Sequence, residues 1–367
     1  MIARATMLLL VAAFTLCACG EREPVRIGFL GGLTGRAADL GESGRNGVQI
    51  AVDEINAAGG IHGRPVELIV RDDGQDTATA IAATNALIAG RVQGIVGPMT
   101  SAMADVVVPI ADREGVVLVS PSVTARKFFA VDDNLFLVMS STREEALLSA
   151  EYHYREGGAR HVVVFHDTTN RSYTESFLAE FSGAFQQLGG AVTPLAFASA
   201  PDMDVGKLVR VALSRHPDAV LLIANSVDAA RFAQKIREVN QAVVLFAAQW
   251  ATTDRLVELG GKAVEGMFLH NYFGRDSASP DLTRLRTTYV QRFRREPGFA
   301  GVAAYDATRA LLGALARRSG NETLRQALLT TGPFPGAEAP FSFDRFGDSS
   351  RVPRIAVVRD GQFVTLR

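Results

Sequence analysis

A polar loop at residues 97–101 follows the short apolar strand predicted at 95–96 and leads into an amphipathic helix. Thr100 and Ser101 stand where that helix begins. The first N–H groups of a helix have no partner inside it, and the helix dipole favours negative charge there. The chemistry that these residues could perform is therefore the binding of a carboxylate or a similar oxygen-rich group.

A second hydroxyl-bearing loop follows the next apolar run, at 116–119, and contains Ser122, Val123 and Thr124. Loops that leave the carboxyl ends of neighbouring parallel strands meet at one edge of an open sheet, where ligands bind. Helix capping and turn formation would explain either loop taken alone. The prediction of a binding site therefore depends on the two loops occurring together.

The length and composition describe an ordinary globular protein with more than one domain. The chain has 367 residues, which is too long for one compact core and enough for two domains. Hydrophobic residues make up 47% and charged residues 21% of the chain. Because the formal net charge is -1, nothing in the charge balance indicates nucleic acid as a partner.

The first residues have the anatomy of a signal peptide, with a basic start and an apolar run at 7–16 that is too short to span a bilayer. The run ends in Leu-Cys-Ala-Cys, which resembles the bacterial lipobox and identifies Cys19 as the lipidated residue. We expect a signal peptide at 1–18, a lipid-anchored tether at 19–24, and a membrane-anchored location in the periplasm or at the cell surface. An ordinary secretory signal is the alternative.

The remaining chain alternates apolar strands with amphipathic helices, which is typical of parallel sheets covered on both faces. The alternation continues too long for one sheet of ordinary width, so we expect two lobes. A glycine-rich loop is predicted at 31–44, with the first helix after it. Short antiparallel strands are expected at the C-terminal end, after residue 340.

Several segments, taken in order, resemble the branched-chain amino-acid-binding family, the type I periplasmic solute-binding proteins of ABC importers. The resemblance covers 25–367. It is carried by NAAGGIHGRP at 56–65, DD at 72–73, VGPMTS at 96–101, SPSVTA at 120–125, EGM at 265–267 and YDA at 305–307.

This resemblance implies an α/β fold of two doubly wound parallel-sheet lobes joined by three crossovers, with a small-molecule ligand between them. It places the N-terminal lobe at 24–142 plus 273–340 and the C-terminal lobe at 143–272 plus 341–367. It also implies an ABC permease as partner, a monomeric state, and neither a cofactor nor a metal.

The family's ligand contacts carry over to particular positions of this sequence. Ser101, with Thr100 beside it, would hold a ligand carboxylate together with Ser122, Val123 and Thr124. From the second lobe the resemblance implies Tyr173, in a loop that is longer than usual, and Ser226, where an aromatic residue is common. Leu40 also stands where an aromatic residue is common, and Trp250 either lines the cleft or packs in the core.

Gln249 departs from the family pattern, because an acidic residue commonly stands there to pair the ligand's ammonium group. A buried ammonium without a counter-charge costs several kcal/mol. Either another carboxylate such as Asp228 replaces it, or the ligand has no free ammonium. The candidates in the second case are an amide, a urea-like solute or a small carboxylic acid.

Two other functions were weighed against solute capture. The glycines after the first strand lack the G-x-G-x-x-G spacing of a dinucleotide site, and no hydrolase or zinc-protease motif is present, so we do not expect an enzyme. The histidines are too scattered for a metal site. A ligand-sensing or partner-regulating lipoprotein with the same fold remains the alternative, since a fold does not decide its use.

Overall fold

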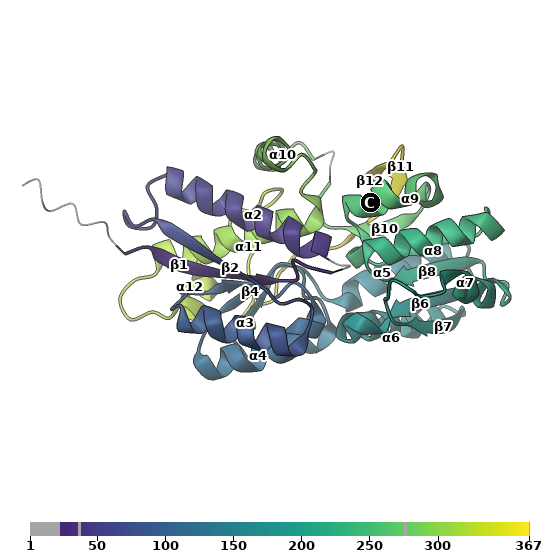
Figure 1. The fold of residues 1–367 in the computed structure, drawn as a ribbon, viewed down its shortest axis with the longest axis horizontal. Helices are drawn as coiled ribbons and strands as arrows, with labels where there is room; N and C mark the ends of the chain where they lie inside the picture. The colour runs from purple at the N-terminus through teal and green to yellow at the C-terminus, as the bar shows by residue number, and fades with distance from the viewer. Residues whose placement is uncertain (1–22, 36–37, 275–276, 367) are drawn as a thin grey trace, which may run out of the picture.

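The computed structural model describes residues 23–35, 38–274 and 277–366. The predicted signal peptide, Cys19 and most of the tether lie outside these residues. Two α/β lobes lie next to each other along the long axis of the molecule, as Figure 1 shows. Within the part of the chain that is described, no helix has the length and apolar character needed to cross a membrane.

The first lobe is built on a five-stranded parallel sheet in the order β2-β1-β3-β4-β5. Its central strands are buried apolar runs, as expected when helices cover both faces of a parallel sheet. The strands are β1 (Val25–Gly31), β2 (Val66–Asp72), β3 (Ile95–Val96), β4 (Leu118–Ser120) and β5 (Leu135–Leu137).

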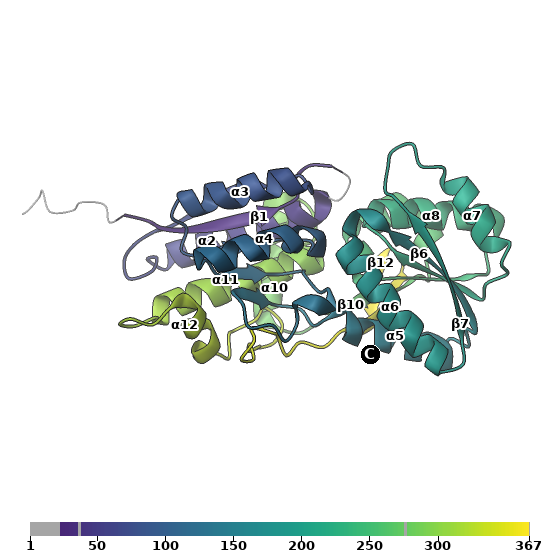
Figure 2. The same ribbon diagram turned by 90° about the horizontal axis from the view of Figure 1, so that it is seen from below.

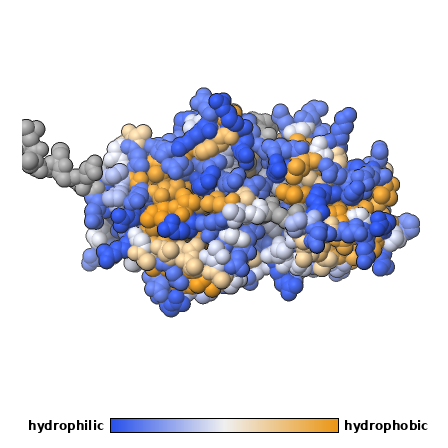
Figure 3. All heavy atoms as spheres, in the orientation of Figure 1, coloured by the Kyte–Doolittle hydropathy of each residue, from blue (hydrophilic) through white to orange (hydrophobic). Residues whose placement is uncertain are grey.

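Helices from two distant parts of the chain cover this sheet. The N-terminal part supplies α2 (Ala38–Ala57), α3 (Thr77–Ala89), α4 (Ser101–Glu114) and the short turn η1 (Arg126–Phe128). The last third of the chain returns with α10 (Pro280–Phe293), α11 (Gly298–Arg317) and α12 (Leu324–Thr331). Figure 3 shows hydrophobic surface gathered over this lobe, near β1 and β2.

The predicted glycine loop at 31–44 is shorter than expected, because α2 already begins at Ala38. The glycines inside α2 allow other backbone segments to pack closely against the helix. A Cβ on Gly41 would lie 1.9 Å from the carbonyl oxygen of Gly32, and one on Gly47 would lie 2.1 Å from that of Gly301. The backbones of α2 and α11 therefore touch at a point where no side chain fits.

The second lobe is built on a seven-stranded sheet in the order β12-β11-β10-β9-β8-β6-β7. Strands β6 to β10 run parallel, and β11 and β12 join antiparallel at one edge, as predicted for the C-terminal strands. The bounds are β6 (His161–Asp167), β7 (Ala191–Phe197), β8 (Ala219–Ile223), β9 (Val244–Ala247), β10 (Phe268–Asn271), β11 (Arg354–Arg359) and β12 (Gln362–Thr365).

Helices lie on both faces of the second sheet. In Figure 2, α5 and α6 lie on one face, and α7 and α8 lie on the other. The longer helices are α5 (Thr142–Arg155), α6 (Arg171–Gln187), α7 (Val205–Leu213), α8 (Ser226–Val239) and α9 (Asp254–Gly260). Short turns are η2 (Thr168–Asn170), η3 (Gln249–Ala251) and η4 (Gly261–Val264).

The chain passes between the lobes three times: between β5 and α5, between β10 and α10, and before β11. The first two crossovers touch, since the hydroxyls of Ser140 and Tyr272 are 2.8 Å apart.

The third crossover lies later in the chain than the lobe boundary expected after residue 340. The N–H of Leu137 donates to the Gly347 carbonyl at 2.8 Å, and Phe343 packs edge-on against Phe136. Aromatic packing keeps this segment on the first lobe.

Candidate ligand-binding site

A narrow cavity with a free volume of about 20 Å³ lies between the two lobes, and it is called the ligand cavity below. The first lobe contributes Leu40, Met99, Thr100, Ser101, Ser122 and Thr124, with Phe299 from the start of α11. The second lobe contributes Asn170, Tyr173, Gln249 and Trp250. This volume is far below that of open small-molecule sites, so the lobes in this arrangement leave free room for about one water molecule.

Ser101 opens α4 and links the two predicted loops. Thr100 is the N-cap of α4, in extended backbone conformation and without a side-chain cap. The Ser101 hydroxyl oxygen accepts weak hydrogen bonds from the N–H groups of Thr124 (3.4 Å) and Ala125 (3.3 Å). Because that oxygen only accepts here, the Ser101 O–H proton is free to be donated to a guest.

The second loop is tied to the first by hydroxyl groups that are not directed at the guest. The Ser122 hydroxyl donates to the Met99 carbonyl at 2.7 Å, and the Ser120 hydroxyl donates to the Pro98 carbonyl at 2.7 Å. The N–H of Val123 donates to the Ser120 hydroxyl at 3.1 Å. Val123 is fully buried and is not among the residues that line the ligand cavity, and its ligand contact stays a prediction.

Tyr173 and Trp250 form an aromatic wall on the side of the second lobe. Their rings meet edge to face, with centroids 6.0 Å apart and planes at 81°. Burial raises the pKa of the Tyr173 phenol well above 10, and the negative charge of Glu145 adds to this shift. The phenol is therefore protonated at neutral pH and can donate a hydrogen bond.

Gln249 begins η3, after the carboxyl end of β9, and its side chain is buried in the cavity wall. Its backbone N–H donates to Glu145 Oε1 at 2.7 Å. The same carboxylate oxygen lies 3.0 Å from His270 Nδ1, and both of these side chains are almost fully buried. Glu145 thus supports the loop from behind, while the amide of Gln249 faces the cavity.

Three buried polar atoms around the ligand cavity make no hydrogen bond of normal geometry to the described residues. They are Thr124 Oγ1, the Tyr173 hydroxyl and Gln249 Nε2. Buried polar groups are almost always paired, and an unpaired one costs about 1–3 kcal/mol. These three come from both lobes and converge on one space. They can all donate hydrogen bonds, which suits a guest that carries acceptor oxygens.

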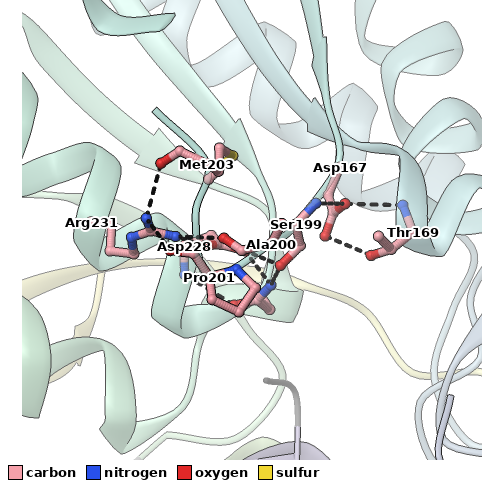
Figure 4. Close-up of polar contacts among 9 residues, drawn as sticks. Asp167, Thr169, Ser199, Ala200, Pro201, Met203, Asp228 and Arg231 are labelled. Carbon is pink, nitrogen blue, oxygen red and sulfur yellow. Dashed lines mark hydrogen bonds and ion pairs between the residues drawn. The ribbon is translucent and has the colours of Figure 1, made fainter. Parts of the chain in front are cut away.

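Asp228 does not provide the missing carboxylate, so the alternative that it replaces an acidic residue at 249 is wrong. Its side chain has no exposed surface and lies 3.2 Å from Arg231 Nη1. Its other oxygen accepts hydrogen bonds from Asn225 Nδ2 (2.8 Å) and the Ser199 hydroxyl. Figure 4 shows this network, which lies among second-lobe residues such as Met203. Within the part of the chain that the structure describes, no charged residue lines the ligand cavity.

Ser226 also differs from its prediction, because its hydroxyl is engaged outside the ligand cavity. It donates at 2.6 Å to Oδ2 of Asp39, in the first turn of α2. The Thr253 hydroxyl donates to the same oxygen, also at 2.6 Å. Asp39 belongs to the first lobe and its two partners to the second. These three residues are called the Asp39 clasp below.

A second group of contacts joins the lobes between α4 and α6. Asn170 Oδ1 accepts from the N–H of Ala102 at 3.1 Å, and the Ser172 hydroxyl donates to Asp105. The Ser176 hydroxyl accepts from the N–H of Arg126 at 3.0 Å. With the Asp39 clasp, these contacts define a closed arrangement of the lobes.

Six of the eight predicted site residues line the ligand cavity, namely Thr100, Ser101, Ser122, Thr124, Tyr173 and Gln249. Their roles in binding stay predictions. The sequence analysis missed Met99, Asn170 and Phe299. Asn170 had a usable signal, because it precedes α6 in a polar loop after a strand. Phe299 had none, because it belongs to the start of a helix far from any strand end of the first lobe.

Two lobes of doubly wound sheet with a small cavity between them define a two-lobed binding protein. The chain belongs to the periplasmic binding protein family, whose model matches residues 24–361. It is 26% identical over 352 residues to the Leu/Ile/Val-binding protein homolog 2 of Brucella abortus, with 90% of this chain and 89% of that protein covered. The resemblance seen in the sequence is thereby confirmed.

Solved structures agree with the fold. The leucine-binding protein LivK of Thermotoga maritima has a TM-score of 0.86 to this chain at 26% identity, with 94% of this chain and 98% of that one covered. A solute-binding protein of an ABC transporter from R. palustris, solved in complex with benzoate, has a TM-score of 0.84 at 19% identity, covering 94% and 95%. The chain therefore has the type I periplasmic binding protein fold.

Proposed function

We propose that this chain is an extracytoplasmic solute-binding lipoprotein that captures an amino-acid-like small molecule between its lobes for an ABC importer. The proposed ligand carries a carboxylate or an amide oxygen and has no free ammonium group. An amide, a urea-like solute and a small carboxylic acid fit this description. Capture of an ordinary zwitterionic amino acid, as the names of the relatives would suggest, is the competing possibility.

One observation supports this proposal above the others: the ligand cavity combines unpaired hydrogen-bond donors with an uncharged wall. Thr124, Tyr173 and Gln249 each present a buried polar atom that makes no hydrogen bond of normal geometry to the described residues. None of the described residues that line the cavity is acidic, so none of them could supply a counter-charge to a buried ammonium group. The fold itself does not require an amino acid, since a protein of this fold is known in complex with benzoate.

The proposed capture has two steps. In the open protein the ligand's oxygen atoms dock on Ser101, at the start of α4 where the helix dipole favours negative charge, and on Thr124 in the loop after β4. The second lobe then closes over the ligand, bringing Tyr173 and Gln249 into contact with it and forming the Asp39 clasp. Closure follows because the ligand contacts both lobes, and only differential affinity for the closed form can shift the equilibrium.

The proposed anchor and partner follow from the sequence. Lipidated Cys19 would hold the protein at a membrane in the periplasm or at the cell surface, with 19–24 as tether. The two lobes would move about the three crossovers. The first would comprise 24–142 plus 273–340 and the segment up to Asp348, and the second 143–272 plus the remainder of 341–367. The permease of the importer would recognise the closed form.

The test is a thermal-shift screen of the chain from Glu21 onward against aliphatic amino acids, short amides, urea and small aromatic acids. A ligand at 100 times its Kd stabilises the folded state by about 2.7 kcal/mol, which gives a readily measured rise in Tm. We expect an amide or an acid to raise Tm and leucine not to. If leucine alone raises Tm, the proposed ligand class is wrong. If no member does, the sensing or partner-regulating function is favoured instead.

A further inference from the structure

Strand β2 forms one edge of the first sheet, and among the described residues no strand pairs with its outer side. It is a continuous strand of 7 residues, and Leu68, Ile69 and Val70 at its centre are apolar and half-buried. Hydrophobic surface gathers over this region in Figure 3. An apolar edge strand is a template for pairing with a strand of another chain. The outer side of β2 is therefore a candidate contact surface.

Helix α3, which packs beside β2, adds an exposed face without charge. None of its 13 residues is acidic or basic, and Ala78, Ile81 and Ala82 are exposed. A helix that faces water normally carries charged residues on that side. Ile69 lies against the end of this helix, since its Cδ1 would be 3.6 Å from a Cβ on Gly90. The edge strand and the helix thus adjoin, and both suit contact with protein.

The bonds between β1 and β2 determine which backbone groups of β2 face outward. The Pro65 carbonyl accepts from the N–H of Val25 at 2.8 Å, and the N–H of Asp73 donates to the Gly31 carbonyl at 3.2 Å. Both bonds lie at odd-numbered residues of the β2 segment. Successive residues of a strand alternate in direction, so the even-numbered residues direct their N–H and C=O groups away from β1.

The outward groups of Leu68 and Val70 are the ones available to a partner strand. Those of Val66 are occupied, because the side-chain amide of Asn56 accepts its N–H at 2.7 Å and donates to its carbonyl at 2.9 Å. The Val70 carbonyl accepts from Arg71 Nη1 at 2.9 Å, an exposed contact that a partner strand can displace. The available edge is therefore short and centred on Ile69.

A second copy of β2, running antiparallel, fits this edge in a register that its charges favour. When Ile69 faces Ile69 of the second copy, Leu68 and Val70 are opposite each other and can exchange both backbone hydrogen bonds. Glu67 then lies opposite Arg71 of the second copy, and Arg71 opposite its Glu67. Opposite charges in such pairs stabilise a sheet and like charges destabilise it. Moving the axis to Leu68 or Val70 keeps the bonds but loses both charge pairs.

We propose that this chain forms a two-fold symmetric dimer through antiparallel pairing of β2, with Ile69 on the axis. The partner is a second copy because the charges of this edge are complementary to themselves, as a two-fold interface requires. Glu67 then lies between Arg26 of its own chain, 2.9 Å away, and Arg71 of the second copy. The dimer departs from the monomeric state that the resemblance implied, and it does not depend on which ligand is bound.

Charge reversal, followed by sedimentation velocity on the chain from Glu21 onward, tests the dimer. Arg71→Glu and Glu67→Arg each place like charges opposite each other, so each should raise the dimer Kd at least about tenfold. An equimolar mixture of the two variants should dimerise again, because every basic residue of one then faces an acidic residue of the other. Arg155→Glu reverses an exposed charge on α5 of the second lobe and should leave the Kd unchanged.

Disulfide trapping tests the register. Both cysteines of the chain precede residue 21, so the chain from Glu21 onward has none of its own. Residues opposite each other without mutual hydrogen bonds have Cα atoms about 4.5 Å apart, a separation that a disulfide spans. Mild oxidation should therefore link Ile69→Cys into a dimer. Leu68→Cys is the matched control, because it faces Val70 of the second copy rather than itself, and it should stay unlinked.

Each other outcome overturns the inference. A wild type that sediments as a monomer at every concentration shows that β2 does not pair with a second copy. A dimer that both charge variants retain uses another face of the molecule. Equal linking of the two cysteine variants excludes the register centred on Ile69. Circular dichroism shows whether each variant is folded, and the mixture of charge variants keeps the test decisive because its recovery requires both to be folded.

Discussion

The backbone N–H of Gln249 donates a 2.7 Å hydrogen bond to the carboxylate of Glu145, and both residues are buried. This contact directs a carboxylate to the back of the loop that closes the ligand cavity. Glu145 does not line the cavity, so the loop presents an amide to the ligand and keeps its acidic support behind. The ligand specificity that we propose follows from this arrangement.

Replacing Gln249 by Glu should convert the site to one that accepts an ammonium group. The new carboxylate would pair the ammonium of leucine, so we expect leucine affinity to rise at least tenfold over the wild type, which corresponds to about 1.4 kcal/mol. Affinity for 4-methylpentanoate should fall, because two carboxylates would then face each other. Isothermal titration calorimetry measures both. Gln241→Glu adds the same charge at an exposed position and should change neither affinity.

Ser101→Ala should weaken binding strongly without unfolding the protein. The variant loses the hydroxyl that is free to donate to the ligand's oxygen, and a hydrogen bond to a charged group contributes about 1.5–3 kcal/mol. Affinity for the best ligand of the screen should fall about 10- to 150-fold. Ser149→Ala is the control, because the buried Ser149 hydroxyl has no partner among the described residues, and its loss should leave affinity unchanged. An unaltered affinity in Ser101→Ala would argue against the site.

Asp39→Ala should weaken closure rather than docking. It removes the acceptor shared by Ser226 and Thr253, whose hydroxyls can return to water when the lobes open. We expect faster ligand release and an affinity about threefold to tenfold lower. Stopped-flow measurements give the rate, and small-angle scattering shows whether the saturated variant is less compact. Asp39→Asn keeps an acceptor oxygen, so its ligand release rate should lie between those of the wild type and Asp39→Ala. Equal release rates in all three proteins would exclude a role for the clasp.

Asp73 should make the protein less stable as pH rises from about 4 to 6. Burial raises the pKa of this carboxyl to about 6, the charge of Asp72 adds to the rise, and the N–H of Gln75 opposes it. Between the unfolded pKa near 4 and the folded value, the native state keeps a proton that the unfolded state has released. Stability therefore falls through this window, and the loss is complete above pH 6.

The Asp73→Asn variant tests this by urea unfolding at pH 4.5 and 7.5. The free energy of unfolding of the variant minus that of the wild type should rise by about 2 kcal/mol from pH 4.5 to pH 7.5, on the order of 1.4 kcal/mol per pKa unit. Asp133 has a pKa raised to about 6 by its own burial, and it cancels because both proteins contain it. Parallel stability curves would contradict the assignment to Asp73.

Much of the fold could be predicted from the sequence, because the alternation of apolar strands and amphipathic helices is local. The strands β3 and β4 lie at the apolar runs expected at 95–96 and 116–119. The extent of α2 could not be predicted in the same way. Its glycines weaken a helix by local propensity, and they are tolerated because Gly41 and Gly47 allow close approach of other backbones.

The site residues that follow strand ends could be predicted from the sequence. Contacts that form only between the two lobes, or with distant parts of the chain, could not. Ser101 and Thr124 lie together because β3 and β4 are neighbours in a parallel sheet. Ser226 also follows a strand end, but its partner Asp39 comes from the other lobe, and no local pattern indicates that contact. Phe299 returns from the last third of the chain, so only the assembled fold places it in the ligand cavity.

The most direct test of the account compares matched ligands that differ only in the ammonium group. Calorimetry with the wild type would use three pairs: alanine and propanoate, leucine and 4-methylpentanoate, and phenylalanine and 3-phenylpropanoate. The account predicts that the member without the ammonium binds at least tenfold more tightly in each pair that binds. Tighter binding of the amino acids would contradict it, and would mean that a carboxylate such as Glu145 reaches the ligand after all.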